Sequence, residues 1–115
     1  MSPETASAYP GYFDGVTLKS YLESARRAHA GKAYGEDARR AQFVYGYIVG
    51  IVDALNNDTA GHFFCQPLSI TKERDAEIVL QYMDANPAVL SIMVGSNATL
   101  YVFDALGDAF PCKKR

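Results

Sequence analysis

A cysteine and a histidine lie close together in one short stretch of the sequence, GHFFCQPLSITKER. His62 precedes Cys65 by three residues, and these residue types supply the nucleophile and the base of thiol enzymes. Cysteine catalysis also needs a residue that orients the base; nothing local supplies one, and His29 is the only other histidine. Zinc needs three or four ligands at a recognisable spacing, which one His-Cys pair does not provide. We therefore predict no catalytic site, no metal and no cofactor.

A disulfide is the other use that the sequence offers for Cys65, because the chain contains one further cysteine, Cys112. Cys65 precedes a predicted third helix, and Cys112 follows a predicted fourth helix. These two ends meet if the helices pack antiparallel, which satisfies the distance requirement of a bridge. Such a bridge stabilises a domain by roughly 4 kcal/mol in the chain-entropy model. It also indicates an oxidising compartment, whereas two buried free thiols would fit a cytosolic protein.

Four helices are expected to position these cysteines, and the fold class is predicted as all-α. Residues 1–16, rich in proline and glycine, are predicted to form an irregular arm, and residues 17–115 a single helical domain. Thr17 and Thr71 are the predicted N-caps of the first and third helices. Pro87 ends the third helix, because proline disfavours a helical conformation in the residue before it. Apolar residues recurring at helical spacing predict helices over residues 18–30, 36–56, 72–86 and 93–110.

The second predicted helix is apolar around most of its circumference, which is typical of the central helix of a bundle. Gly46 and Gly50 lie one turn apart in it and form a flat strip. Such a strip lets another helix approach closely, either inside the monomer or across a dimer. Asp53 follows in the same helix, and we interpret it as a solvent-facing or capped carboxylate rather than a partner contact.

Charge and hydropathy exclude two classes of partner. The net charge is −2, whereas nucleic acids and anionic membranes attract a basic excess. The longest apolar run, Ala41 to Val52, is well short of the roughly 20 residues of a membrane helix, so no membrane insertion is expected. The first fifteen residues lack the features of a secretion signal, so the protein is either cytosolic or a mature form cut from a longer precursor.

Four motifs follow one another over the last two-thirds of the chain: YGYIVGIVDAL, FFCQPLSIT, YMDANPAVL and ALGDAFPC. In order and spacing they resemble the Rap/Tai immunity proteins, which protect bacteria against amidase effectors of the type VI secretion system. That family has a Gly-Tyr-hydrophobic-x-Gly helix, a Cys-x-Pro before a Val/Ile-Thr helix start, a His/Asn-Pro break and a closing Ala-Leu…Phe-Pro-Cys. The corresponding positions here are Gly46 to Leu55, Cys65 to Thr71, Asn86-Pro87 and Ala105 to Cys112.

The resemblance implies a small, mostly helical periplasmic protein that is made with a signal peptide and is commonly a homodimer. It implies no enzyme activity of its own, because the protein would occlude the active site of a papain-like peptidoglycan amidase. It also implies that the Cys65–Cys112 bridge is a family feature. Many members carry a second cysteine pair, whose places are held here by Tyr21 or Leu22, and by Val44. Packing must replace that second bridge.

The residues that contact the partner are predicted from expected exposure and polarity. The first candidates belong to the polar loop before Cys65: Asn56, Asn57, Asp58, Thr59 and His62. The next are the break from Asn86 to Ser91 and the charges at the start of the third helix: Lys72, Glu73 and Asp75. The rival interpretation is a small periplasmic helical binding or chaperone-like protein with no toxin partner.

Overall fold

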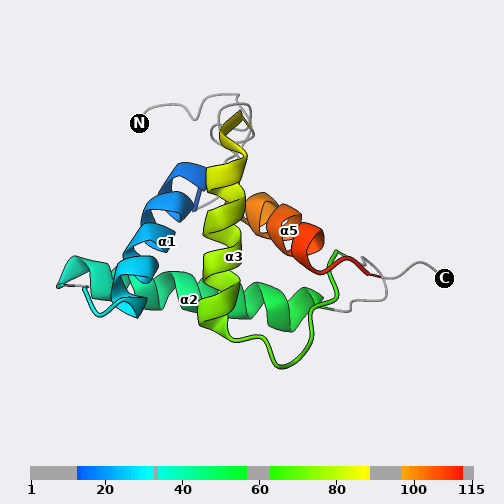
Figure 1. Ribbon diagram of the computed structural model, residues 1–115, viewed down its shortest axis with the longest axis horizontal. Coiled ribbons are helices and arrows are strands. Elements are labelled where there is room, and N and C mark those ends of the chain that lie inside the picture. The colour runs from blue at the N-terminus through cyan, green and yellow to red at the C-terminus, as the bar shows by residue number, and fades with distance from the viewer. Residues whose placement is uncertain (1–12, 33, 57–62, 89–96, 113–115) are drawn as a thin grey trace, which may run out of the picture.

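The computed structural model describes residues 13–32, 34–56, 63–88 and 97–112, which form a helical globule (Figure 1). Its named helices are α1 (Gly15–His29), α2 (Glu36–Leu55), α3 (Lys72–Ala85) and α5 (Ala98–Ala109). Within these ranges the backbone forms no strand, only two isolated β-bridges, Asp14 with Asn97 and Asn56 with Phe64. The all-α prediction with four main helices is confirmed.

Helix α1 begins earlier than predicted. Its N-cap is Asp14, whose carboxylate accepts a hydrogen bond from the backbone N–H of Thr17 at 2.8 Å, so the prediction of Thr17 as the cap is wrong. Gly15 opens the helix in contact with the Tyr101 ring, and a Cβ there would overlap the ring. This packing places the helix start within the predicted irregular arm, of which residues 1–12 lie outside the described part.

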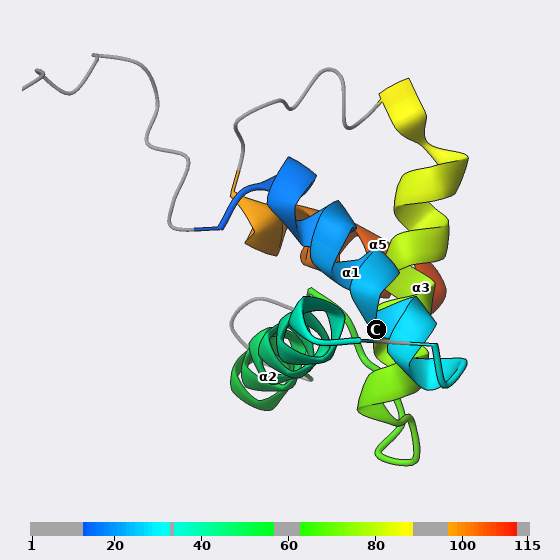
Figure 2. The same ribbon diagram turned by 90° about the vertical axis from the view of Figure 1, so that its left-hand side faces the viewer.

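Helix α2 lies on one side of the bundle, so the prediction that it is central is wrong. Figure 2 shows α2 to one side of the other helices; α1 and α3 each contact all three others, whereas α2 packs mainly against α1 and α3. The outer face of α2 leaves Phe43 and Val49 exposed. Gly35, with φ +51°, starts the helix in a conformation that glycine adopts readily. The inner face buries Ala41, Val44, Tyr45 and Ile48.

The predicted limits of α3 are confirmed. The Thr71 hydroxyl oxygen accepts from the backbone N–H of Arg74 at 3.1 Å, which satisfies one of the free N–H groups of the first turn. At the other end Asn86 is the C-cap, directly before Pro87. The predicted buried stripe is present: Ala76, Val79, Leu80 and Met83 are all buried.

Helix α5 begins at Ala98, and its N-cap is Asn97, whose side chain accepts from the N–H of Thr99 at 2.9 Å. The predicted fourth helix includes Asn97 as a helical residue, which is wrong, because Asn97 has extended backbone angles. Residues 93–96 of that prediction lie outside the described part. The helix ends at Ala109, two residues before Pro111.

The core is one apolar cluster to which all four helices and the segment before α3 contribute. Phe64, from that segment, is fully buried although it belongs to no helix. Burial of these side chains is the main term that stabilises the fold. The largest of them are Leu18, Leu22, Ile48, Phe64, Leu80, Tyr101 and Leu106.

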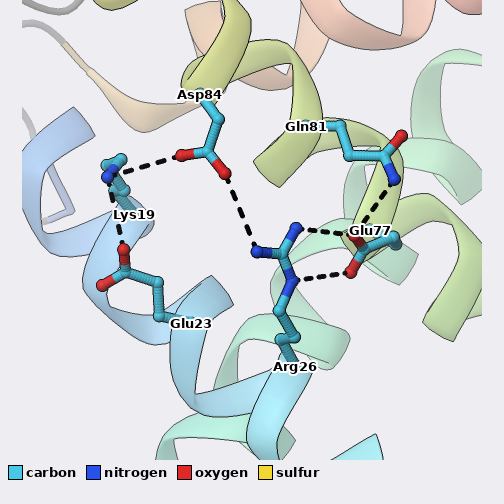
Figure 3. A network of polar contacts seen from close by, with 6 residues as sticks. All are labelled: Lys19, Glu23, Arg26, Glu77, Gln81 and Asp84. Carbon is cyan, nitrogen blue, oxygen red and sulfur yellow. Dashed lines mark hydrogen bonds and ion pairs between the residues drawn. The ribbon is translucent and has the colours of Figure 1, made fainter.

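Polar contacts join α1 to α3 on the surface of the bundle (Figure 3). The Arg26 guanidinium holds both carboxylate oxygens of Glu77, with Nη2–Oε2 at 2.6 Å and Nε–Oε1 at 3.2 Å. The Lys19 ammonium lies 3.5 Å from an Asp84 oxygen. Exposed ion pairs each contribute about 0–1 kcal/mol, so this network mainly fixes how the two helices face one another.

A second polar cluster joins α1 to the first turn of α2. The Asp37 carboxylate accepts from the Ser24 hydroxyl at 2.9 Å and from Nη2 of Arg27 at 2.8 Å. Ser24 is fully buried, so this contact satisfies a hydroxyl that has no access to water. Hydrogen bonds from Arg27 and Ser24 lower the pKa of Asp37 from 3.8 to about 2.

Candidate functional site

The segment between α2 and α3 is fastened to the end of α5. Cys65 and Cys112 form a disulfide, with their Cα atoms 4.9 Å apart, and the backbone N–H of Cys65 donates to the carbonyl of Phe110 at 2.8 Å. The ring of Phe63 stacks on that of Phe103 with centroids 4.6 Å apart. The predicted disulfide is confirmed, and the sulfur of Cys65 is therefore held in a bridge rather than available as a nucleophile.

Asn56 attaches the same segment to the end of α2. Its side-chain Nδ2 donates to the carbonyl of Gln66 at 3.1 Å, and its Oδ1 accepts from the Gln66 N–H at 2.8 Å. Its own backbone N–H caps α2 by donating to the carbonyl of Val52 at 2.9 Å. Asn56 was predicted as a partner contact. In the structure its side chain joins the end of α2 to the backbone of Gln66.

Asp75 is buried, which corrects the prediction of an exposed charge in the first turn of α3. It lies four residues before Val79, so it falls on the buried stripe of the helix. One carboxylate oxygen, Oδ2, accepts from the side-chain Nε2 of Gln66 at 3.0 Å. Burial raises the pKa of Asp75, and the hydrogen bond from Gln66 acts in the opposite direction.

These residues line one cleft, which we call the α2–α3 cleft; it lies between the C-terminal part of α2 and residues 66–75 and encloses about 200 Å³. Its polar lining consists of Asp53, Asn56, Gln66, Lys72 and Asp75. Its apolar lining consists of Val49, Val52, Pro67, Leu68 and Ile70. Leu68 is 96% exposed, so its apolar side chain stands out beside the polar lining.

Lys72 and Glu73, the two other predicted charges of α3, pair with each other at 3.0 Å. The Lys72 hydrogen bond lowers the pKa of Glu73. The same ammonium lies 5.5 Å from the centre of the Tyr45 ring. The two residues line different clefts: Lys72 lines the α2–α3 cleft, and Glu73 lines a separate cleft between α1 and α3.

The structure does not bring Asn86 to this cleft. Asn86 caps the far end of α3, about 20 Å along the helix axis from its first turn, and its side chain donates to the carbonyl of Tyr82 at 2.8 Å. The remaining predicted contacts, Asn57, Asp58, Thr59 and His62, lie outside the described residues. The same is true of residues 89–91 in the predicted break.

Gly46 and Gly50 lie on the exposed outer face of α2. Among the described residues, no atom outside the helix lies within 4 Å of the place that a Cβ would take at either glycine. Close helix packing inside the monomer is therefore not what this strip does in the described part of the chain. Its use across a dimer stays a prediction.

The described residues contain no group of three or more His, Cys, Asp or Glu side chains that could hold a metal ion. No helix among them combines the length and the hydropathy that a membrane span requires. What the described surface offers is a disulfide-anchored cleft with hydrogen-bond acceptors at its base and apolar side chains around them.

Sequence reasoning missed Gln66, Asp53 and Leu68 as lining residues of the cleft. Gln66 carries no local signal, because its partners Asn56 and Asp75 lie ten and nine residues away along the chain. Asp53 was interpreted as a solvent-facing or capped carboxylate rather than a partner contact. The helical spacing between Asp75 and Val79 is the one sequence signal that indicates burial of a charged residue here.

Comparison with known proteins identifies one family. The family model of the Rap1a immunity proteins matches residues 17–112. This range includes both cysteines and all four helices, apart from the first two residues of α1. No curated protein and no solved structure matches the chain. The match agrees with the resemblance to Rap/Tai immunity proteins that the sequence motifs indicate.

Proposed function

The chain belongs to the Rap1a immunity protein family, and from this premise we propose that it binds and inhibits a peptidoglycan amidase effector of the type VI secretion system. Immunity of this kind requires binding and no reaction, so the protein is not an enzyme. An amidase of the papain type must admit the peptide stem of peptidoglycan to its own catalytic cleft. A partner seated over that cleft excludes the stem, and inhibition by occlusion follows.

The observation that supports this function best is the anchored α2–α3 cleft. The disulfide and the Asn56–Gln66 pairing hold its walls, so little conformational entropy is lost when a partner covers them. Leu68 offers an exposed apolar side chain beside buried polar groups. We propose that this cleft, with Lys72 and the neighbouring loop residues Asn57, Asp58, Thr59 and His62, contacts the effector.

We also propose that the protein acts in the periplasm. Disulfides persist in oxidising compartments and are rare in the reducing cytosol. The Cys65–Cys112 bridge therefore suits the periplasm, which is also where an amidase meets peptidoglycan. A signal peptide on the precursor would deliver the chain there.

Two copies of the chain are proposed to pair through the outer face of α2. Gly46 and Gly50 form a flat strip that is open to solvent, and Phe43 and Val49 are exposed on the same helix. A second helix can approach closely over glycines while apolar side chains on either side become buried. The proposed pairing surface and the α2–α3 cleft meet at Val49, which lines both.

The test combines binding with inhibition. The oxidised protein is mixed with the amidase encoded beside its gene, the complex is measured by calorimetry, and release of peptidoglycan fragments is followed with increasing amounts of the chain. We expect a stable complex and cleavage that stops at the binding stoichiometry. An amidase of the same class from an unrelated gene pair is the control and should stay active. No complex and undiminished cleavage would instead favour a binding or chaperone-like protein without a toxin partner.

A further inference from the structure

The α2–α3 cleft contains more hydrogen-bond acceptors than the described residues satisfy. We propose that it receives the basic side chain of an arginine or lysine that projects from the surface of the bound effector. The inference rests on the proposed function, because the effector is the protein that supplies this side chain. It adds the chemistry by which the cleft selects its partner.

Two buried oxygen atoms carry the argument. Gln66 is 5% exposed and Asp75 is 3% exposed, and a single hydrogen bond joins their side chains. The other oxygen of each, Gln66 Oε1 and Asp75 Oδ1, accepts no hydrogen bond from the described residues. Buried polar atoms in native proteins are nearly always paired, so these two acceptors call for a donor that the described residues do not supply. Both oxygens are covered in the free protein, and we expect the Gln66 side chain to turn as the donor enters.

The charges of the cleft favour a cation as this donor. Asp53 is exposed on the cleft lining and forms no ion pair with any described residue. Lys72 is the only basic residue that lines the cleft among the described residues, and its ammonium is paired with Glu73. Two carboxylates, one beside solvent and one at the base, therefore face a single engaged cation. An acidic side chain of a partner would be repelled from the same place.

The shape of the lining suits the stem of a long basic side chain. Val52 and Ile70 are half-buried apolar residues of the cleft, and Leu68 stands exposed beside them. Lysine and arginine bury their methylene groups along such surfaces while the charged end makes hydrogen bonds. A guanidinium offers five donors in a fixed plane, so arginine can satisfy several acceptors of the cleft at once.

The first experiment uses a small probe in place of the effector. The side-chain amide resonances of Asn56 and Gln66 are followed by ¹⁵N NMR while N-acetyl-L-argininamide is added to the oxidised protein. N-acetyl-L-citrullinamide, which has nearly the same shape without the charge, is the matched control. We expect saturable shifts with a Kd on the order of millimolar for the arginine probe, and none for citrulline. Absent shifts, or equal shifts with both probes, would overturn the inference.

The second experiment measures affinity for the amidase with charge-neutral variants. Asp53→Asn should weaken Kd roughly fivefold and make it less dependent on salt, as loss of an exposed charge does. Asp75→Asn should weaken Kd about 30-fold or more, because a buried charge contact is lost. Asp104→Asn makes the same change on the exposed face of α5, outside the cleft, and should leave Kd unchanged.

A stability measurement separates recognition from folding. In Asp75→Asn the new amide oxygen can still accept from Gln66 Nε2, so the hydrogen bond between the two side chains is kept and Tm of the free protein should not fall. Lower affinity at undiminished Tm supports the inference. Unchanged affinity in both cleft variants, while the wild-type protein still inhibits, overturns the inference and leaves the proposed function standing. Binding of the arginine probe without binding of the amidase has the opposite meaning: the cleft selects cations and the amidase is the wrong partner.

Discussion

The side-chain amide of Asn56 forms two hydrogen bonds with the backbone of Gln66, at 3.1 Å to its carbonyl oxygen and at 2.8 Å from its N–H. A side chain thereby completes the pairing that a neighbouring strand would provide in a sheet. The two walls of the α2–α3 cleft are joined at this point, and an isolated bridge between Asn56 and Phe64 continues the contact. This pairing therefore fixes the cleft wall formed by residues 66–71, which belong to no helix.

Asn56→Asp is expected to destabilise the protein more than its small change in shape suggests. The carboxylate still accepts from the Gln66 N–H, but its second oxygen faces the Gln66 carbonyl, and two acceptors then oppose each other. We expect a loss of about 1–3 kcal/mol in the free energy of unfolding, measured in urea. Asn86→Ala, which removes one hydrogen bond to Tyr82, is the control and should lose less. An Asn56→Asp protein as stable as the wild type would contradict this role.

Removal of the disulfide should lower stability by roughly 4 kcal/mol, because the bridge closes a long loop in the unfolded chain. The Cys65→Ser, Cys112→Ser double variant is compared with the oxidised wild type by urea unfolding. Reduced wild-type protein should match the variant. If oxidised and reduced protein unfold at the same urea concentration, the bridge does not stabilise the fold as the chain-entropy model predicts.

Two helical glycines should respond to alanine in opposite directions. Gly15→Ala places a Cβ against the Tyr101 ring, only 2.7 Å from its Cζ atom. This overlap should lower the free energy of unfolding by about 1–3 kcal/mol. Gly46→Ala meets open space and should stabilise α2 by about 0.5–1 kcal/mol through helix propensity. Both are measured by thermal unfolding at a concentration where the chain is monomeric. Equal effects of the two changes would refute the packing of Gly15.

Asp37 should make the protein sensitive to acid. Its folded pKa of about 2 lies below the ordinary value of 3.8, so between these values the unfolded chain binds more protons. The contribution is fully present above about pH 4 and is lost as the pH falls toward 2. Stability of Asp37→Asn, measured from pH 6 to 2 by urea unfolding, should therefore decline less steeply than that of the wild type. Asp104→Asn, on the exposed face of α5, is the control for the loss of one negative charge.

Gly50→Arg tests the proposed pairing of two chains. The outer face of α2 accommodates the side chain in the monomer, so helix content by circular dichroism should be unchanged. A helix from a second copy could no longer approach, and sedimentation should show a monomer where the wild type is a dimer. If the variant dimerises as the wild type does, another surface forms the dimer; a monomeric wild type would end the dimer proposal.

The limits of α3 could be predicted because their causes are local. Thr71 caps the first turn with its own hydroxyl, and Pro87 stops the helix through its ring. The start of α1 could not be predicted in this way. Asp14 and Thr17 are both good caps, and the contact between Gly15 and Tyr101, far apart in the sequence, selects the earlier one.

The site was predicted less completely than the fold. The cysteine pairing followed from where two helices end, and Asn56 and Lys72, predicted as partner contacts, both line the cleft. Asp75 was expected to be exposed because charged residues usually are, and only its contact with Gln66 shows why a carboxylate is tolerated inside. The sequence did not indicate which face of α2 is exposed, because apolar side chains occupy both its inner and its outer face.

The Cys65–Cys112 bridge turns the second half of the chain into a covalent ring that contains α3 and α5. A peptidase that cuts once within this ring produces two fragments that stay joined through the sulfur atoms. The cleft wall that begins at Gln66 then remains tethered to the end of α5 at Phe110. A nicked molecule can therefore keep the α2–α3 cleft assembled, whereas a reduced chain would come apart at the first cut.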